Sequence, residues 1–173
     1  MAVAPLNKVR EVLDYAVTQI PPEKILMGIP NYGYDWTLPY VKGESKARKI
    51  TNNQALEIAD QYNAVVNFDP LAMSPYFKYY DEEGREHEVW FEDEQSIRAK
   101  MSLILEYDLA GLSYWNIMSF YEPNSLVLNE LFDVQKEEIT PIELLEEASE
   151  LGLLGDDTET DEAAADEALG APE

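Results

Sequence analysis

Apolar residues recur at spacings of three and four along much of the chain, and this spacing predicts amphipathic helices. Three stretches show it clearly, at residues 5–20, 51–62 and 94–109, and a shorter helix is expected around 126–132. Pro21 and Pro22 end the first helix, because neither can continue it. Thr51 or Asn52 caps the second helix, and Gly111 ends the third.

Apolar and β-branched runs between these helices predict strands. KILMGIP, residues 24–30, comes directly after the two prolines and is typical of a strand buried on both faces of a parallel sheet. Such a strand needs a parallel neighbour, which the few residues before Leu6 cannot supply. VVNFD, SPYFKYYD and HEVWFED predict an antiparallel, aromatic-rich α+β unit with the helix at 51–62, and EEGRE forms the hairpin loop between the last two. GLSYWNIM, residues 111–118, predicts a second buried strand.

The charge of the chain is strongly negative and unevenly distributed. The formal net charge is −23, of which residues 133–173 supply −14 with 15 acidic residues and one basic residue. This balance argues against nucleic-acid binding, which depends on Lys and Arg, and against binding to anionic membranes. The tail is expected to be helical at 140–151 and disordered beyond Gly155, because it has low hydrophobicity and heavy like charge.

Other compositional features remove whole classes of function. The chain has no cysteine, which excludes disulfides, thiolate metal sites and thiol redox chemistry. No run reaches the roughly 18 apolar residues of a membrane span, and the N-terminus lacks the pattern of a secretory leader. The chain is therefore expected to be soluble and to carry no targeting signal.

The order of the motifs resembles one known family. KILMGIPNYGYDW, then YFKYYDEEGREHEVWFEDEQSIRAK, then LAGLSYWNIM, is similar to the C-terminal part of glycoside hydrolase family 18, and most similar to its bacterial spore cortex-lytic N-acetylglucosaminidases. The resemblance implies an α/β fold, the last strands of a (β/α)8 TIM barrel with a small α+β insertion domain between strands seven and eight. It assigns 1–40 to a barrel helix and strand seven, 41–93 to the insertion, 94–135 to the last barrel helix and strand eight, and 136–173 to the acidic tail.

The resemblance also implies that the N-terminal strands, one to six, are absent from this sequence. The DxxDxE motif of the family, whose final glutamate is the general acid, does not occur in the 173 residues. In the family the N-acetyl oxygen of the substrate attacks the anomeric carbon while that glutamate protonates the leaving oxygen. We therefore expect no catalytic residue in this chain and no activity from the chain alone.

Aromatic residues near the ends of the predicted strands are candidates for binding sugar. Tyr32, Tyr34 and Trp36 follow the first strand, where barrel enzymes bind their ligands. Asn31 and Asp35 stand beside them and could hydrogen-bond to sugar hydroxyls. The alternative is that these aromatics only pack against the insertion.

Two residues of GLSYWNIM complete the predicted site. A tryptophan in an apolar strand is usually a core residue, but the resemblance implies that Trp115 forms the floor under the sugar that is cleaved. Asn116 is the neighbouring candidate. His87, between two glutamates on the predicted hairpin, is expected to be exposed and without a catalytic or metal role. No metal and no cofactor are expected.

Three interpretations of function stay open. In the first, the chain is part of a hydrolase acting on N-acetylglucosamine-containing polysaccharide, either spore cortex peptidoglycan or a chitin-like polymer, and its candidate partner is the missing N-terminal barrel half. In the second, it is a non-catalytic carbohydrate-binding module. In the third, it is an acidic protein-interaction module. The resemblance favours the first and suggests the spore or cell envelope as the location.

Overall fold

The N-terminal helix and the first strand form as the hydrophobic pattern predicts. The structure, a computed structural model, describes residues 1–134; the helix and the disordered segment predicted in the tail lie outside these residues. Helix α1 (Leu6–Gln19) is followed by a 3-10 turn η1 (Pro22–Lys24) and strand β1 (Leu26–Pro30). Pro22 occupies the first position of η1, where a backbone N–H would have no partner inside the helix. The missing N–H of proline therefore loses no hydrogen bond there.

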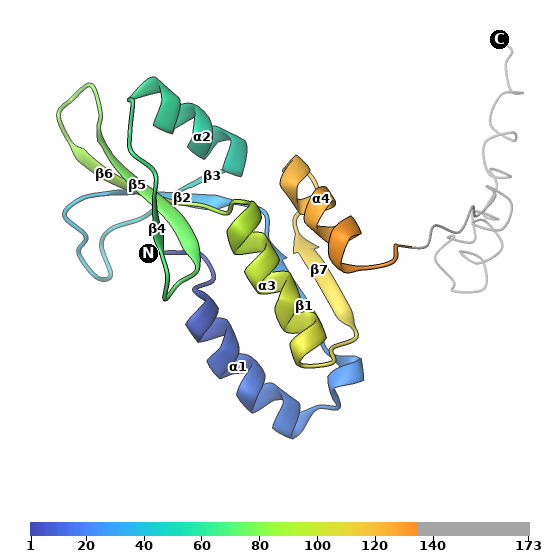
Figure 1. Cartoon of the computed structure of the whole chain (residues 1–173). Coiled ribbons are helices and arrows are strands. Elements are labelled where there is room, and N and C mark those ends of the chain that lie inside the picture. Colours follow the sequence, from blue (N-terminus) through green and yellow to red (C-terminus); the bar gives the residue numbers. More distant parts are fainter. Residues whose placement is uncertain (135–173) are drawn as a thin grey trace, which may run out of the picture. The chain divides into compact units, whose positions relative to one another are not determined.

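Strand β1 pairs in parallel with a strand from the other end of the described region (Figure 1). Its partner β7 (Gly111–Trp115) follows helix α3 (Glu94–Glu106) and precedes helix α4 (Glu122–Leu131). The register aligns Leu26 with Gly111 and Pro30 with Trp115, so the carboxyl ends of the two strands meet. The parallel neighbour that β1 requires therefore comes from residues 111–115, and the predicted parallel pairing is confirmed.

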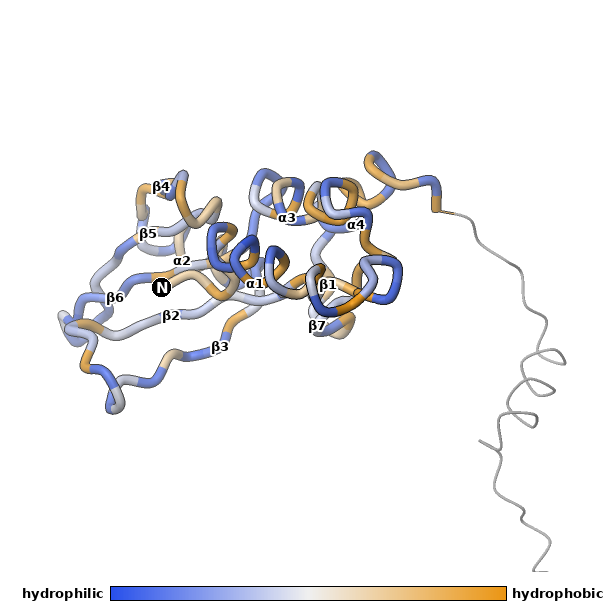
Figure 2. Tube along the Cα trace, turned by 90° about the horizontal axis from the view of Figure 1, so that it is seen from below, coloured by the Kyte–Doolittle hydropathy of each residue, from blue (hydrophilic) through white to orange (hydrophobic). Residues whose placement is uncertain are grey.

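One face of this strand pair is packed and the other is open. Met27 and Ile29 are buried in a core that α1, α3 and α4 complete (Figure 2). On the opposite face Leu26 is 60% exposed and Trp115 is 68% exposed. The prediction that β1 is buried on both faces is wrong for the described residues, because alternate side chains of a strand point to opposite faces and the helices cover one of them.

A separate antiparallel sheet of five strands forms the other half of the described region. The strands are β2 (Gly33–Thr37), β3 (Arg48–Ile50), β4 (Asn67–Asp69), β5 (Ser74–Tyr80) and β6 (Glu86–Trp90), in the order β3-β2-β6-β5-β4. The three strands and the hairpin predicted at residues 65–93 are confirmed. Strand β2 lies before the predicted domain boundary at residue 40, yet it pairs with β3 and β6 of this sheet.

Helix α2 (Asn52–Gln61) covers one face of the five-stranded sheet (Figure 1). Thr51 caps it through a capping box, as the sequence predicts. The core between helix and sheet consists of Ile50, Ala55, Ala59, Phe77, Tyr79, Val89 and Phe91. The other face of the sheet carries no helix among the described residues.

A buried ion pair joins the sheet to α3. The Nζ atom of Lys100 donates a hydrogen bond to Oε2 of Glu92 at 2.8 Å, and both side chains are almost fully buried. Lys100 also donates to the hydroxyl of Ser74 at 3.3 Å, on strand β5. This contact fixes the five-stranded sheet against the helix that leads into β7.

Two predicted helix ends differ from the structure. Helix α3 stops at Glu106, and the left-handed residue beyond it is Asp108, with φ of 53°, rather than Gly111. Aspartate tolerates this conformation through local hydrogen bonding of its short side chain. Helix α4 begins at Glu122, earlier than residue 126, because Pro123 suits the first turn of a helix. Within residues 1–134 no helix is both long and apolar enough to cross a membrane.

Candidate functional site

Asn31 holds the carboxyl ends of β1 and β7 together. Its backbone N–H donates to the carbonyl of Trp115 at 3.1 Å. Its side-chain Nδ2 donates to the carbonyls of Asn116 at 3.2 Å and Ser119 at 2.6 Å, and its Oδ1 accepts from Nδ2 of Asn124 at 2.5 Å. Because both amide N–H groups are used within the protein, Asn31 orients the strand ends. Its predicted contact with sugar hydroxyls stays a prediction.

Trp115 presents its indole at the end of β7. Its side chain is exposed despite the apolar strand around it, and the peptide bond to Asn116 is cis. The Oδ1 atom of Asn116 accepts the backbone N–H of Met118 at 3.0 Å, which shapes the loop after the strand. An exposed indole at the end of a parallel strand is available for contact with a ligand.

The aromatics that follow β1 form a continuous row. Tyr32 meets Tyr34 with ring centroids 5.5 Å apart, Tyr34 meets Trp36 at 5.8 Å, and Trp36 meets Tyr40 at 5.5 Å, all edge to face. The Nζ atom of Lys49 lies 4.4 Å from the centroid of Tyr32, at cation–π distance. The structure therefore brings three of the predicted sugar-binding residues together.

The row continues across the sheet. Tyr34 pairs with Trp90 in the register of β2 and β6, and Trp90 stacks on Tyr76 of β5 at 4.7 Å. We call the face formed by Tyr32, Tyr34, Trp36, Tyr76 and Trp90 the aromatic face. All five rings are half-buried, so each keeps part of its surface accessible. Desolvation and a hydrogen bond with Tyr34 raise the pKa of Tyr32, so its hydroxyl stays protonated at neutral pH.

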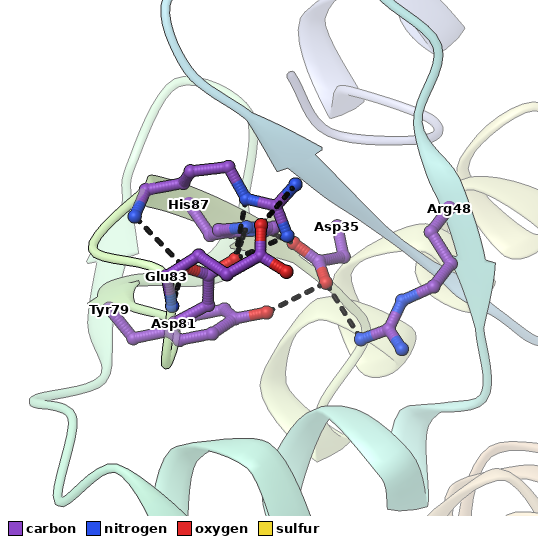
Figure 3. Close-up of polar contacts among 7 residues, drawn as sticks. Asp35, Arg48, Tyr79, Asp81, Glu83 and His87 are labelled. Carbon is purple, nitrogen blue, oxygen red and sulfur yellow. Dashed lines mark hydrogen bonds and ion pairs between the residues drawn. The ribbon is translucent and has the colours of Figure 1, made fainter.

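Asp35 does not join the aromatic face, which corrects the prediction that it meets sugar hydroxyls there. Since Tyr34 and Trp36 point to one face of β2, the residue between them points to the other. Oδ2 of Asp35 accepts hydrogen bonds from the Tyr79 hydroxyl at 2.9 Å and from Arg48 at 2.8 Å (Figure 3). The carboxylate is buried beneath these partners, on the α2 side of the sheet.

His87 completes this cluster, and the prediction that it is exposed is wrong. It is 9% exposed, and its Nδ1 lies 2.8 Å from Oδ1 of Asp35 (Figure 3). Its Nε2 lies 3.3 Å from Oδ2 of Asp81, and its ring stacks on Tyr79 at 4.8 Å. The hairpin alternation places His87 on the inner face while its neighbours Glu86 and Glu88 point outward.

The environment of the cluster shifts two pKa values. Desolvation and the hydrogen bond to Asp35 raise the pKa of Tyr79, which keeps its hydroxyl protonated as a donor. Desolvation acts to raise the pKa of Asp81, but hydrogen bonds from the backbone and side chain of Arg85 outweigh it and lower this pKa to about 2. Asp81 is therefore a carboxylate at neutral pH.

Neither arrangement contains the parts of a metal centre. Among residues 1–134, no group of three or more His, Asp or Glu side chains is placed to hold a metal ion. The aromatic face and Trp115 can contact the apolar faces of sugar rings. The Asp35 cluster is a polar network behind the strand that carries this face. No local signal in the sequence predicts the network, because the partners of Asp35 lie 13, 44 and 52 positions away.

Comparison with known proteins identifies similar chains. The sequence profile of glycosyl hydrolases family 18 matches residues 2–119. The chain is 50% identical over 135 residues to the cortical fragment-lytic enzyme of Bacillus subtilis (strain 168), a match covering 78% of this chain and 31% of that protein. It is 30% identical over 120 residues to the di-N-acetylchitobiase of Homo sapiens, covering 60% of this chain and 31% of that protein.

Solved structures give the same result. The spore cortex-lytic enzyme SleL of Bacillus megaterium QM B1551 matches with a TM-score of 0.75 and 46% identity, over 79% of this chain and 32% of that chain. A chitinase of Chromobacterium violaceum ATCC 12472 matches with a TM-score of 0.69 and 30% identity, over 78% of this chain and 41% of that chain. The chain spans about a third of the length of the curated relatives it matches.

Proposed function

The chain belongs to glycosyl hydrolase family 18, and from this premise we propose that it is the sugar-binding C-terminal part of a glycosidase that acts on N-acetylglucosamine-containing polysaccharide. In this proposal β1 and β7 are the last two strands of a TIM barrel, and the five-stranded sheet is an insertion between them. The substrate is peptidoglycan of the spore cortex or a chitin-like polymer.

The observation that carries the proposal is the exposed indole of Trp115 at the point where β1 and β7 end together. Parallel register aligns Pro30 with Trp115. In barrel enzymes the ligand binds at the carboxyl ends of the strands. A 68% exposed tryptophan on an otherwise apolar strand costs free energy unless a ligand or partner covers it.

The aromatic face supports the same conclusion. Pyranose rings have apolar C–H faces that pack on aromatic rings, and their hydroxyls and acetamido groups hydrogen-bond at the rim. Tyr32 and Trp36 follow β1 closely, so in the proposal they border the sugar that rests on Trp115. Tyr34 extends the surface toward neighbouring sugars. In the proposal Asn116 contacts the sugar at the edge of this site, and Asn31 holds the ends of β1 and β7 in position.

The proposal assigns the proton donor to residues outside this sequence. The substrate-assisted reaction needs one glutamate to protonate the leaving oxygen. The DxxDxE motif that supplies it in the family does not occur in the 173 residues, and Glu88, a carboxylate on the aromatic face, is already held by Nε1 of Trp90 at 2.6 Å and by Lys78 at 3.7 Å. The chain by itself is therefore proposed to bind glycan without cleaving it.

The open face of β1 and β7 indicates what kind of partner the chain would bind. Leu26 and Trp115 are exposed on it, and the edges of the two-stranded sheet have unpaired backbone groups among the described residues. Unpaired edges and apolar faces favour association with further strands. The proposed partner is a polypeptide that carries the first six strands of the barrel.

A complementation assay tests the proposal. The chain is incubated with chitooligosaccharides and with cortex fragments, alone and with the N-terminal two thirds of the Bacillus subtilis cortical fragment-lytic enzyme, and released reducing ends are measured. The expected result is no release by the chain alone and release by the mixture. Trp115→Ala should abolish the release, while Tyr15→Ala, which removes an equally exposed aromatic from α1 (69%), should not. Hydrolysis by the chain alone overturns the assignment of the proton donor.

A second candidate function is a non-catalytic glycan-binding module, and the aromatic face favours it. Four of its five rings stand on β2, β5 and β6 of the five-stranded sheet, so most of this face needs no further barrel strands to form. Binding that survives Trp115→Ala but is lost in Trp36→Ala would favour this candidate over a barrel subsite.

A further inference from the structure

A cavity of about 620 Å³ lies between α2 and the sheet face opposite the aromatic face. Asp35, Tyr79 and His87 line it from the sheet, and Gln54 and Ile58 line it from the helix. Its volume falls within the roughly 300–1,000 Å³ that small-molecule sites occupy. The cavity is therefore large enough for a sugar ring with its substituents.

The two carboxylates on the sheet side of the cavity are already satisfied. Asp35 accepts from Tyr79 and Arg48 and lies beside His87, as described above. Asp81 accepts the backbone N–H of Arg85 at 2.8 Å and its side-chain Nε at 2.7 Å. These carboxylates have donors around them and offer little to a ligand.

Donor groups at the cavity edge remain available. Arg48 has a side chain that is 63% exposed, and within residues 1–134 its hydrogen bond to Asp35 uses one of its five N–H groups. Gln54 accepts the N–H of Thr51 with Oε1 at 2.9 Å, which leaves its amide N–H groups for another partner. A planar guanidinium with free N–H groups matches the two oxygens of a carboxylate.

The opposite wall offers an acceptor. Glu57 and Gln61 line the cavity from α2. A carboxylate and an amide in this position can accept hydrogen bonds from sugar hydroxyls. Besides His87, the charged side chains that face the cavity are those of Arg48, Arg85, Asp35, Glu57 and Asp81, since Lys49 of the same lining turns its Nζ to Tyr32 on the other face. Because Arg48 and Arg85 pair with Asp35 and Asp81, an anionic ligand meets less repulsion here than beside unpaired carboxylates.

We infer that this cavity binds a sugar that bears a carboxylate, with Arg48 holding the carboxylate and Glu57 accepting from the hydroxyls. The inference rests on the proposed function for its choice of glycan. N-acetylmuramic acid is N-acetylglucosamine with a lactyl ether, whose carboxylate is free in the monosaccharide and in muramic residues that carry no peptide, and chitin lacks this sugar. Because the cavity and the aromatic face lie on opposite sides of the sheet, the cavity forms a second contact with the glycan.

The matched pair of sugars provides the test. N-acetylmuramic acid and N-acetylglucosamine are titrated into the full chain, and the affinities are measured by calorimetry. The charge-assisted contact with Arg48 is expected to make the acidic sugar about tenfold or more tighter. Arg48→Gln should remove this preference. Arg98→Gln is the control, since Arg98 pairs with Glu94 and Glu130 on the surface of the helices and does not line the cavity.

Two further measurements show whether the variant still folds and whether the sugar binds at this cavity. Arg48→Gln leaves Asp35 with Tyr79 and His87, so the fold should persist, which a thermal melt checks. In the unaltered chain, the acidic sugar should shift the amide resonances of α2 and β3 rather than those of β7. Equal affinity for both sugars, a preference that survives Arg48→Gln, or no detectable binding overturns the inference. Chitooligosaccharide binding that is unchanged in Trp115→Ala, with the acidic-sugar preference intact, would instead count against the proposed function.

Discussion

The ion pair of Lys100 and Glu92 gives a sharp test of how the five-stranded sheet is fixed to α3. The two side chains are 2% and 1% exposed, and their charged atoms are 2.8 Å apart. Lys100→Met keeps the apolar stem and removes the charge, so Glu92 is left buried without its counter-ion. Breaking such a pair costs about 3–5 kcal/mol. The same substitution also removes the donor that Lys100 provides to the hydroxyl of Ser74.

The double variant Lys100→Met/Glu92→Met should behave differently. It removes both charges together, and replacing a buried pair by apolar residues is often neutral or stabilising by about 1–4 kcal/mol. Urea denaturation followed by tryptophan fluorescence gives the free energy of unfolding for each variant. Lys24→Met, at an exposed position in η1, is the control and should change this energy by no more than about 0.5 kcal/mol.

The pH dependence adds an independent check on the single variant. Burial raises the pKa of Glu92 above its ordinary value of 4.5, and Lys100 acts to lower it. In Lys100→Met the raised folded pKa means that stability is present at low pH and is lost as the pH rises through that value. The deficit should therefore shrink on acidification. A cost below about 1 kcal/mol for the single variant, or a double variant as unstable as the single one, would show that this ion pair does not fix the sheet to α3.

Three smaller predictions concern local structure. Thr51→Ala should lower the free energy of unfolding by about 1 kcal/mol in urea titrations, because it removes the α2 cap. Asp81 has its folded pKa lowered to about 2 from 3.8, so its stabilising effect exists above pH 4 and is lost between pH 4 and 2; Asp81→Asn should flatten an acid-unfolding curve in that window. Gly33→Ala should cost about 1–3 kcal/mol, because a Cβ there would clash with the carbonyl oxygen of Trp90, whereas Gly28→Ala, which meets no atom within 4 Å, serves as its control in the same melts.

The pattern of apolar residues predicts the elements that depend on local periodicity. The helices at 6–19, 52–61 and 94–106 and the strands around 26–30 and 111–115 follow directly from it. Strand β3 cannot be predicted from periodicity, because it has three residues and no alternation of polar and apolar side chains. The prediction from the sequence assigns the residues of β2 to an exposed extension of β1 and not to a separate strand. Their alternation of Tyr34, Asp35 and Trp36 is the signal that indicates a strand of its own.

The candidate site is predictable only in part, for a physical reason. Aromatic rings near strand ends are visible in the sequence, so Tyr32, Trp36 and Trp115 can be proposed from it. The burial of His87 and Asp35 depends on which face of the sheet α2 covers, and that packing joins residues far apart in the chain. The few residues around His87 or Asp35 in the sequence do not show which distant residues these side chains contact.

The affinity of the chain for chitotetraose, measured before and after removal of the Trp115 indole, shows directly whether sugar rests on Trp115. A sugar site at the ends of β1 and β7 predicts saturable binding by titration calorimetry, about tenfold or more weaker in Trp115→Ala and unchanged in Tyr15→Ala, because burial of an aromatic face against sugar contributes about 1.5–3 kcal/mol. Equal affinity of the Trp115→Ala variant and the unaltered chain, or no saturable binding, would contradict a sugar site at the ends of β1 and β7.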